Sequence, residues 1–133
     1  MDSLTQAVLG GAVGYAILGQ RIGKRAALYG AAFGTLPDLD VLIDFGGPIE
    51  NLTHHRGFSH SFLIQALVAP VLAWMITRPK QFTDLAFLKW WLAIFLCFVT
   101  HSLADLFTVY GTQILWPWSA HPFSHSLLFI IDP

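Results

Sequence analysis

Charged residues are scarce in this chain. Lysine, arginine, aspartate and glutamate together make up 11% of its 133 residues, whereas hydrophobic residues make up 55%. The mean hydropathy of +0.60 is too high for an ordinary soluble domain. A formal net charge of −1 also argues against nucleic acid as a partner. We therefore expect a single domain over residues 1–133, embedded in a lipid bilayer.

Cysteine is almost absent. Cys97 is the one cysteine, and it lies inside an apolar run, where a small core or lipid-facing residue is expected. A single thiol excludes both an internal disulfide and a cysteine-based zinc site. A basic segment ahead of the first apolar run is also lacking, so a cleavable signal peptide is not predicted. That run is expected to remain as a membrane helix.

Apolar runs occupy most of the chain and predict an all-α fold. They cover residues 4–18, 26–36, 62–76, about 88–110 and 127–131, and the last is too short to cross a bilayer. The first two runs each contain two glycines four residues apart, a spacing that permits close helix contact in lipid. The expected architecture is a polytopic transmembrane helical bundle with about four spanning helices and a partial C-terminal segment.

Basic residues cluster in two alternate loops, one at residues 20–25 and one at residues 77–89. They are Arg21, Lys24, Arg25, Arg78, Lys80 and Lys89. The positive-inside rule places both loops in the cytoplasm of a multi-pass inner-membrane protein. The segments between these loops should then meet at the non-cytoplasmic face.

Side chains that bind metals occur in the segments expected at that face. Residues 54–61 contain three histidines and an arginine, a Pro-Asp-Leu-Asp element covers residues 37–40, and a His and an Asp are spaced i, i+4 near the end of the fourth run. Carboxylates this close to hydrocarbon are costly and indicate function, although a helix cap would explain one of them. Imidazole and carboxylate together suit a divalent metal, with zinc the expected ion. The predicted ligands are His55, His60, His101, Asp105, Asp38 and Asp40.

Arg56 is predicted to have a catalytic role without binding the metal, because a guanidinium has no lone pair to donate. It suits a non-bridging phosphoryl oxygen. Asp38 and Asp40 are predicted as further ligands or as general-base groups. Asp2 or Ser3 is expected to cap the first helix, and a place for Gln6 at the edge of the site is the less favoured alternative. His121 and His125 are expected to be polar interface residues.

Taken together, these motifs resemble the YdjM-like family of membrane-bound metal-dependent hydrolases of bacteria and archaea. The resemblance runs along nearly the whole chain, and two departures accompany it. Many members have histidine at the position of Gln6, and many continue with further helices, so this chain is expected to be a C-terminally shortened form. The matching elements are Met1-Asp2-Ser3-Leu4-Thr5-Gln6, Pro37-Asp38-Leu39-Asp40, His55-Arg56-Gly57-Phe58-Ser59-His60-Ser61, His101 with Asp105, Tyr110-Gly111-Thr112-Gln113 and Asp132-Pro133.

The resemblance implies a metal-dependent hydrolase. The His-xxx-Asp pattern is also similar to that of zinc-dependent phospholipase C, so the expected substrate is a phosphoester of a lipid or lipid-like molecule, cleaved by a metal-activated water. A non-catalytic module, in which a structural metal or a His/Asp network ties the helices together and the surface binds a partner, remains the alternative. Metal transport is a third possibility, but the apolar cytoplasmic halves of the runs argue against a continuous polar path.

Overall fold

Helices form the whole framework of the described part of the chain. The computed structural model describes residues 2–42, 46–47, 57–77, 84–109, 111–125 and 127. Within these ranges no strand occurs, apart from an isolated bridge between Thr112 and Phe123. The predicted all-α class is confirmed. The elements are α1 (Ser3–Ile22), α2 (Arg25–Thr35), η1 (Leu36–Leu42), η2 (Phe58–His60), α4 (Phe62–Thr77) and α5 (Asp84–Leu106), where η1 and η2 are 3-10 helices.

Helices α1 and α2 form a hairpin whose backbones lie in close contact. Asp2 caps α1, as predicted, by accepting a hydrogen bond from the backbone N–H of Thr5. Glycines line the contact between the two helices. A Cβ atom on Gly14 would lie 2.6 Å from the carbonyl oxygen of Ala26 and 2.7 Å from Cα of Gly30. The small-residue spacing read from the sequence therefore serves helix packing.

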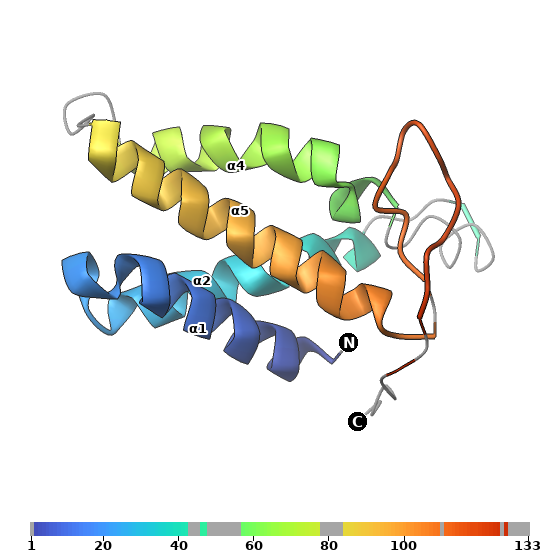
Figure 1. The fold of residues 1–133 in the computed structure, drawn as a ribbon, viewed down its shortest axis with the longest axis horizontal. Helices are drawn as coiled ribbons and strands as arrows, with labels where there is room; N and C mark the ends of the chain where they lie inside the picture. The colour runs from blue at the N-terminus through green and yellow to red at the C-terminus, as the bar shows by residue number, and fades with distance from the viewer. Residues whose placement is uncertain are drawn as a thin grey trace.

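Helix α5 runs through the bundle and packs against α1, α2 and α4 (Figure 1). Its buried residues Ala93, Ile94 and Phe98 complete two small cores, one with α4 and one with the α1–α2 hairpin. Cys97 is buried in the same helix, as expected. Residues 111–125 then cross the far end, where the backbone N–H of Phe62 donates to the carbonyl of Ile114. The single long helix thus connects the hairpin, α4 and the C-terminal segment.

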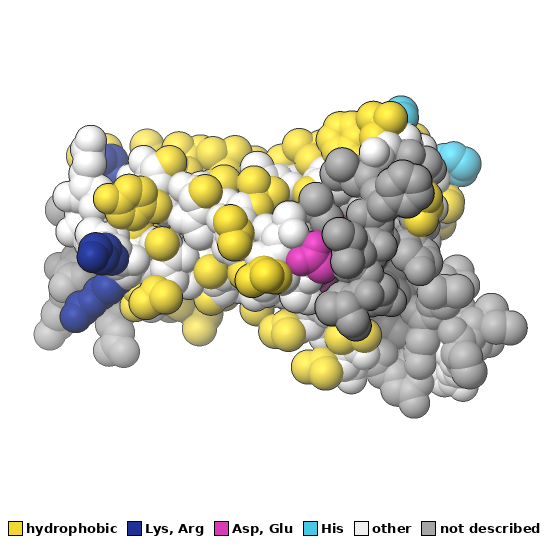
Figure 2. Space-filling view, turned by 90° about the horizontal axis from the view of Figure 1, so that it is seen from below, with side chains coloured by type: hydrophobic (Ala, Val, Ile, Leu, Met, Phe, Trp, Pro, Cys, Tyr) yellow, Lys and Arg dark blue, Asp and Glu magenta, His cyan; other side chains and the backbone are white. Residues whose placement is uncertain are grey.

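The two ends of the bundle differ in charge. The turn between α1 and α2 and the adjoining ends of α4 and α5 lie at one end, and η1, η2 and the end of α5 lie at the other (Figure 1). Lysine and arginine side chains gather at the first end (Figure 2). One predicted loop boundary was wrong, because α5 begins at Asp84 and Lys89 is helical. Apolar Leu85 and Phe87 extend the helix into the segment that looked like a polar loop.

On the face seen in Figure 2, hydrophobic side chains are spread over the surface between the two ends. Of the described residues, one stretch, Leu85–Leu106 of α5, is long and apolar enough to cross a membrane. The prediction of four spanning helices is not confirmed, since α2 has 11 residues and α4 has 16, against about 20 for a span. Pro37 ends the α-helical hydrogen-bond pattern early and the chain tightens into η1. Large exposed apolar side chains include Leu4, Val8, Leu28, Leu67, Val71, Trp74, Met75, Leu85 and Leu88.

Candidate metal centre

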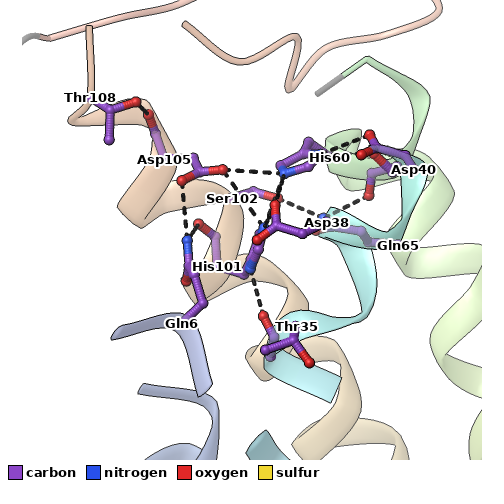
Figure 3. Close-up of polar contacts among 12 residues, drawn as sticks. Gln6, Thr35, Asp38, Asp40, His60, Gln65, His101, Ser102, Asp105 and Thr108 are labelled. Atoms are coloured by element: carbon purple, nitrogen blue, oxygen red, sulfur yellow. Dashed lines mark hydrogen bonds and ion pairs between the residues drawn. The ribbon is translucent and has the colours of Figure 1, made fainter. Parts of the chain in front are cut away.

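Four metal-binding side chains converge at the end of the bundle away from the basic residues. Asp38 comes from η1, His60 from η2, and His101 and Asp105 from one face of α5 (Figure 3). One ligand atom from each residue lies within 4.8 Å of the other three. The i, i+4 spacing on α5 and the prediction that His60 lies beside it are therefore confirmed. Whether these residues bind a metal stays a prediction.

Five of the six distances between the four ligand atoms are close to those in a tetrahedral metal site. The Nε2 atoms of His60 and His101 lie 3.0 Å apart. Oδ1 of Asp38 lies 3.7 Å from Nε2 of His60 and 3.3 Å from Nε2 of His101. Oδ2 of Asp105 lies 3.3 Å from Nε2 of His60 and 3.7 Å from Nε2 of His101. A tetrahedral ion with ligands at about 2.0–2.2 Å has edges of roughly 3.3–3.6 Å. The donor set and its spacing therefore suit a metal ion.

Hydrogen bonds on the outer side of each imidazole fix its tautomer. Nδ1 of His101 lies 2.6 Å from the carbonyl oxygen of Gly34, which can only accept, so Nδ1 carries the proton. Nδ1 of His60 lies 2.8 Å from Oγ of Ser59, whose hydroxyl donates to Oδ2 of Asp40 at 2.5 Å. The serine must then accept from His60. With the proton on Nδ1, the neutral form of each ring turns its Nε2 lone pair towards the centre, which is the form in which imidazole binds a metal.

The electrostatics of the centre also favour a positive charge. Burial raises the pKa of the Asp38 carboxyl, but hydrogen bonds to His101 and His60 outweigh this effect and hold the pKa below its ordinary value. Burial likewise lowers the pKa of His60, yet the neighbouring carboxylates of Asp105 and Asp38 outweigh this effect and raise it. Asp105 and His60 are completely buried, whereas the Asp38 side chain is 21% exposed. Among these four described residues, Asp38 is therefore the accessible one.

The structure separates the two carboxylates of the Pro-Asp-Leu-Asp element. Oδ2 of Asp40 lies 3.8 Å from Nδ1 of His60, on the opposite side of the ring from the metal-facing nitrogen. Asp40 thus lies outside the group of four and supports His60 through Ser59. Tight 3-10 winding places two residues that are two positions apart on different sides of η1.

Gln6 is the residue that the sequence interpretation undervalued. It lies on α1 with 1% of its surface exposed, and its Nε2 donates to Oδ1 of Asp105 at 3.1 Å (Figure 3). This bond fixes the carboxylate so that Oδ2 faces the two histidines. A buried glutamine one turn into an apolar helix was the available signal, because an amide in that position needs a polar partner.

The remaining predicted residues divide into two groups. His121 and His125 are exposed and are not part of the group of four. The others lie outside the described residues; they are His54, His55, Arg56 and Asp132. The roles predicted for His55 and Arg56 therefore stay predictions.

Comparison with known proteins identifies relatives, one of which is named as an inner membrane protein. The chain is similar to the inner membrane protein YbcI of Escherichia coli (strain K12), with 34% identity over 123 residues that cover 90% of this chain and 69% of YbcI. It is also similar to the uncharacterized protein YfhP of Bacillus subtilis (strain 168), with 31% identity over 100% of this chain and 42% of YfhP. The chain thus spans less than half the length of YfhP. No solved structure matches it significantly.

A family match covers the whole chain. Residues 1–133 match the family described as YdjM inner membrane protein, the family whose motifs the sequence carries. This match and the name of YbcI confirm the expected inner-membrane location and contact with the bilayer. Four polar residues from these motifs, Asp38, His60, His101 and Asp105, meet in the described centre, and the apolar side chains on the exterior suit a bilayer. The chain therefore belongs to the YdjM inner membrane protein family.

Proposed function

We propose that this protein is a membrane-bound metal-dependent hydrolase that cleaves a phosphoester of a lipid or lipid-like substrate. The observation that carries the proposal is the pair of Nε2 atoms 3.0 Å apart, flanked by two carboxylate oxygens at tetrahedral spacing. Two nitrogen and two oxygen donors without cysteine are typical of hydrolytic rather than structural zinc sites. The bilayer location favours a lipid as the substrate.

Each residue of the centre has a proposed task. A bound divalent metal would supply Lewis-acid chemistry and acidify water. His60, His101 and Asp105 are completely or almost completely buried and are suited to hold the ion, while Asp38 stands at the exposed edge. Asp38 accepts the proton of the attacking water as the water oxygen bonds to phosphorus. The ester P–O bond then breaks, and the leaving oxygen takes up the proton that Asp38 accepted.

Arg56 is proposed to hold a non-bridging oxygen of the phosphoester. The proposal rests on the sequence, in which Arg56 precedes the η2 segment that carries His60. A guanidinium stays charged and donates to phosphate oxygens without competing for the metal. Arg56 would therefore stabilise the transition state.

The experiment combines metal analysis of the purified protein with a screen of lipid phosphoesters. We expect about one divalent metal per chain if all four donors surround one ion. Arg56→Ala should leave metal content and thermal stability unchanged and lower hydrolysis by about 10²–10³-fold. Arg21→Ala, at the basic end of the bundle, is the matched control. Loss of metal in Arg56→Ala, or no hydrolysis of any phosphoester by the wild type, would count against the proposal.

A structural metal is the second candidate, because four protein donors can close the coordination shell of a tetrahedral ion. The variant Asp38→Ala distinguishes a structural metal from a catalytic one. If the ion is structural, Asp38→Ala should release metal and destabilise the fold as much as Asp105→Ala does. If Asp38 serves in hydrolysis, Asp38→Ala should keep most of the metal and lose activity.

We also propose that the chain crosses the membrane several times with its basic loops in the cytoplasm. The described lysines and arginines lie at the end opposite the metal centre, which supports this orientation (Figure 2). Single cysteines at positions 23 and 50 provide the test with a membrane-impermeant thiol reagent added from outside. Modification at position 50 and protection at position 23 are expected, and the reverse pattern would contradict the orientation.

A further inference from the structure

An apolar pocket opens beside the candidate metal centre, between η1, η2, α4 and α5. Its volume is about 140 Å³. A dry apolar cavity of roughly 150 Å³ accommodates a benzene-sized group, so this pocket suits a segment of hydrocarbon rather than a whole lipid. Its apolar walls are Leu36, Pro37, Phe58, Ile64, Val68 and Phe98.

Two polar residues in the pocket wall, Ser59 and Gln65, connect it to the metal centre. Oγ of Ser59 lies 2.8 Å from Nδ1 of His60. Nε2 of Gln65 donates to the carbonyl oxygen of Ser59 at 3.1 Å and to Oγ of Ser102 at 2.6 Å, next to His101 in the chain. Gln65 is 2% exposed, and its Oε1 has no hydrogen-bond partner among the described residues. Gln65 thus joins the pocket wall to the segments that carry the two histidines.

The outer and inner sides of the pocket differ in how exposed their residues are. Leu36 and Val68 in its wall are 36% and 38% exposed, and they belong to the apolar exterior of the bundle. At the inner side, Pro37 adjoins Asp38, the one residue of the metal-binding group that is partly exposed. The mouth of the pocket therefore opens onto the apolar exterior of the bundle, and its inner side borders Asp38.

We propose that this pocket binds the hydrocarbon chain of the lipid phosphoester, which enters laterally from the bilayer. The proposal rests on the proposed function, because the metal centre is taken to bind the phosphoester end of the same molecule. An apolar wall joined to a polar, metal-binding edge matches an amphipathic ligand of this kind. A water-soluble phosphoester would leave the pocket walls uncovered.

A photoreactive alkyl phosphate, with a diazirine within its alkyl chain, tests this proposal on the zinc-loaded protein in phospholipid vesicles. We expect labelling to concentrate on the peptides that contain Ile64, Val68 and Phe98. Val68→Phe fills the pocket and should lower this labelling by about tenfold. Val71→Phe is the matched control, because Val71 is an exposed valine of the same helix that is not part of the pocket. Ile64→Phe provides a second filling variant.

Competition separates a bound substrate chain from ordinary bilayer contact. An excess of unlabelled alkyl phosphate should suppress the labelling, whereas the alcohol of the same chain length should not, and removal of zinc should weaken it. Labelling spread evenly over the exposed face of α4, with equal intensity around Val71, would overturn the proposal.

The outcome for the pocket is independent of the outcome for hydrolysis. Pocket-specific labelling by a protein that cleaves no phosphoester would support the lipid site and contradict the proposed hydrolysis. If the protein hydrolyses lipid phosphoesters but the labelling is as strong in both filling variants as in the wild type, the proposed lipid pocket alone is contradicted.

Discussion

Two regions of the bundle are packed in opposite ways. One is the glycine-lined contact between α1 and α2, and the other is the candidate metal centre at the end of the bundle. In the first region, side chains are absent, and Gly10, Gly14, Gly30 and Gly34 let the backbones touch. In the second region, buried polar side chains fill the space and bind one another; Gln6, His60, Gln65, His101 and Asp105 are each at most 2% exposed. A chain in lipid gains little from burying large apolar groups, so close contact and hydrogen bonds hold the helices together.

Gly34 connects the two regions. A Cβ atom on this residue would lie 2.7 Å from the carbonyl oxygen of Gln6, so the close approach of α1 requires glycine here. The carbonyl oxygen of Gly34 also accepts the hydrogen bond from Nδ1 of His101. The helix contact therefore determines where Gln6 and His101 lie. The following predictions test how far one region depends on the other.

The largest expected effect is that of His101→Ala on metal binding. Zinc sites gain roughly 10–16 kcal/mol that is shared among four ligands, so losing one should weaken affinity on the order of 10²–10³-fold. His121→Ala, an exposed histidine outside the centre, is the control. Metal titration with a competing chelator measures both variants, and equal affinities would contradict the assignment of His101.

Gly14→Ala should destabilise the helix contact. The added methyl group meets the backbone of Ala26 and Gly30, and such overpacking costs about 1–3 kcal/mol in the free energy of unfolding. Gly19→Ala is the control in the same helix, because its methyl group meets only the ring of the exposed Tyr15. It should be neutral or stabilising, since alanine favours helix. Unfolding in detergent micelles provides the comparison.

Gln6→Leu should weaken metal binding without removing the site. Leucine keeps the volume but loses the bond to Oδ1 of Asp105. Outer hydrogen-bond partners of metal ligands contribute 10–100-fold to affinity, and we expect about tenfold here. Gln20→Leu, an exposed position of the same helix, should leave the affinity unchanged. An unchanged affinity in Gln6→Leu would show that Asp105 is held by the fold alone.

The smallest expected effect is that of Asp2→Ala on the stability of α1. Hydrogen bonds from Thr5 hold the pKa of the Asp2 carboxyl below its ordinary value. The stabilisation is therefore present above the ordinary carboxyl pKa and is lost as pH falls through the lowered value. Asp2→Asn should keep a cap that does not depend on pH in this range. Thermal unfolding of the three proteins at neutral and acidic pH tests this, and a cap that persists in acid would contradict it.

Local patterns in the sequence were sufficient for much of the fold. The cap at Asp2, the glycine pairs, the apolar runs and the i, i+4 pair on α5 depend on residues close together in the chain, and each has a local physical cause. Local patterns did not decide how many helices are long enough to span a membrane. Apolar composition sets which segments prefer lipid, but Pro37 shortened the second helix and α4 ended after 16 residues.

The sequence by itself determined which residue types could bind a metal and that they belong to the end opposite the basic loops. Only the tertiary structure decided which of them meet. Asp38 joins His60, His101 and Asp105, Asp40 supports His60 from behind, and Gln6 orients Asp105 across 99 positions of sequence. The reason is that the partners lie far apart in the sequence and that 3-10 winding sets which side of η1 each carboxylate faces, and local patterns do not record either.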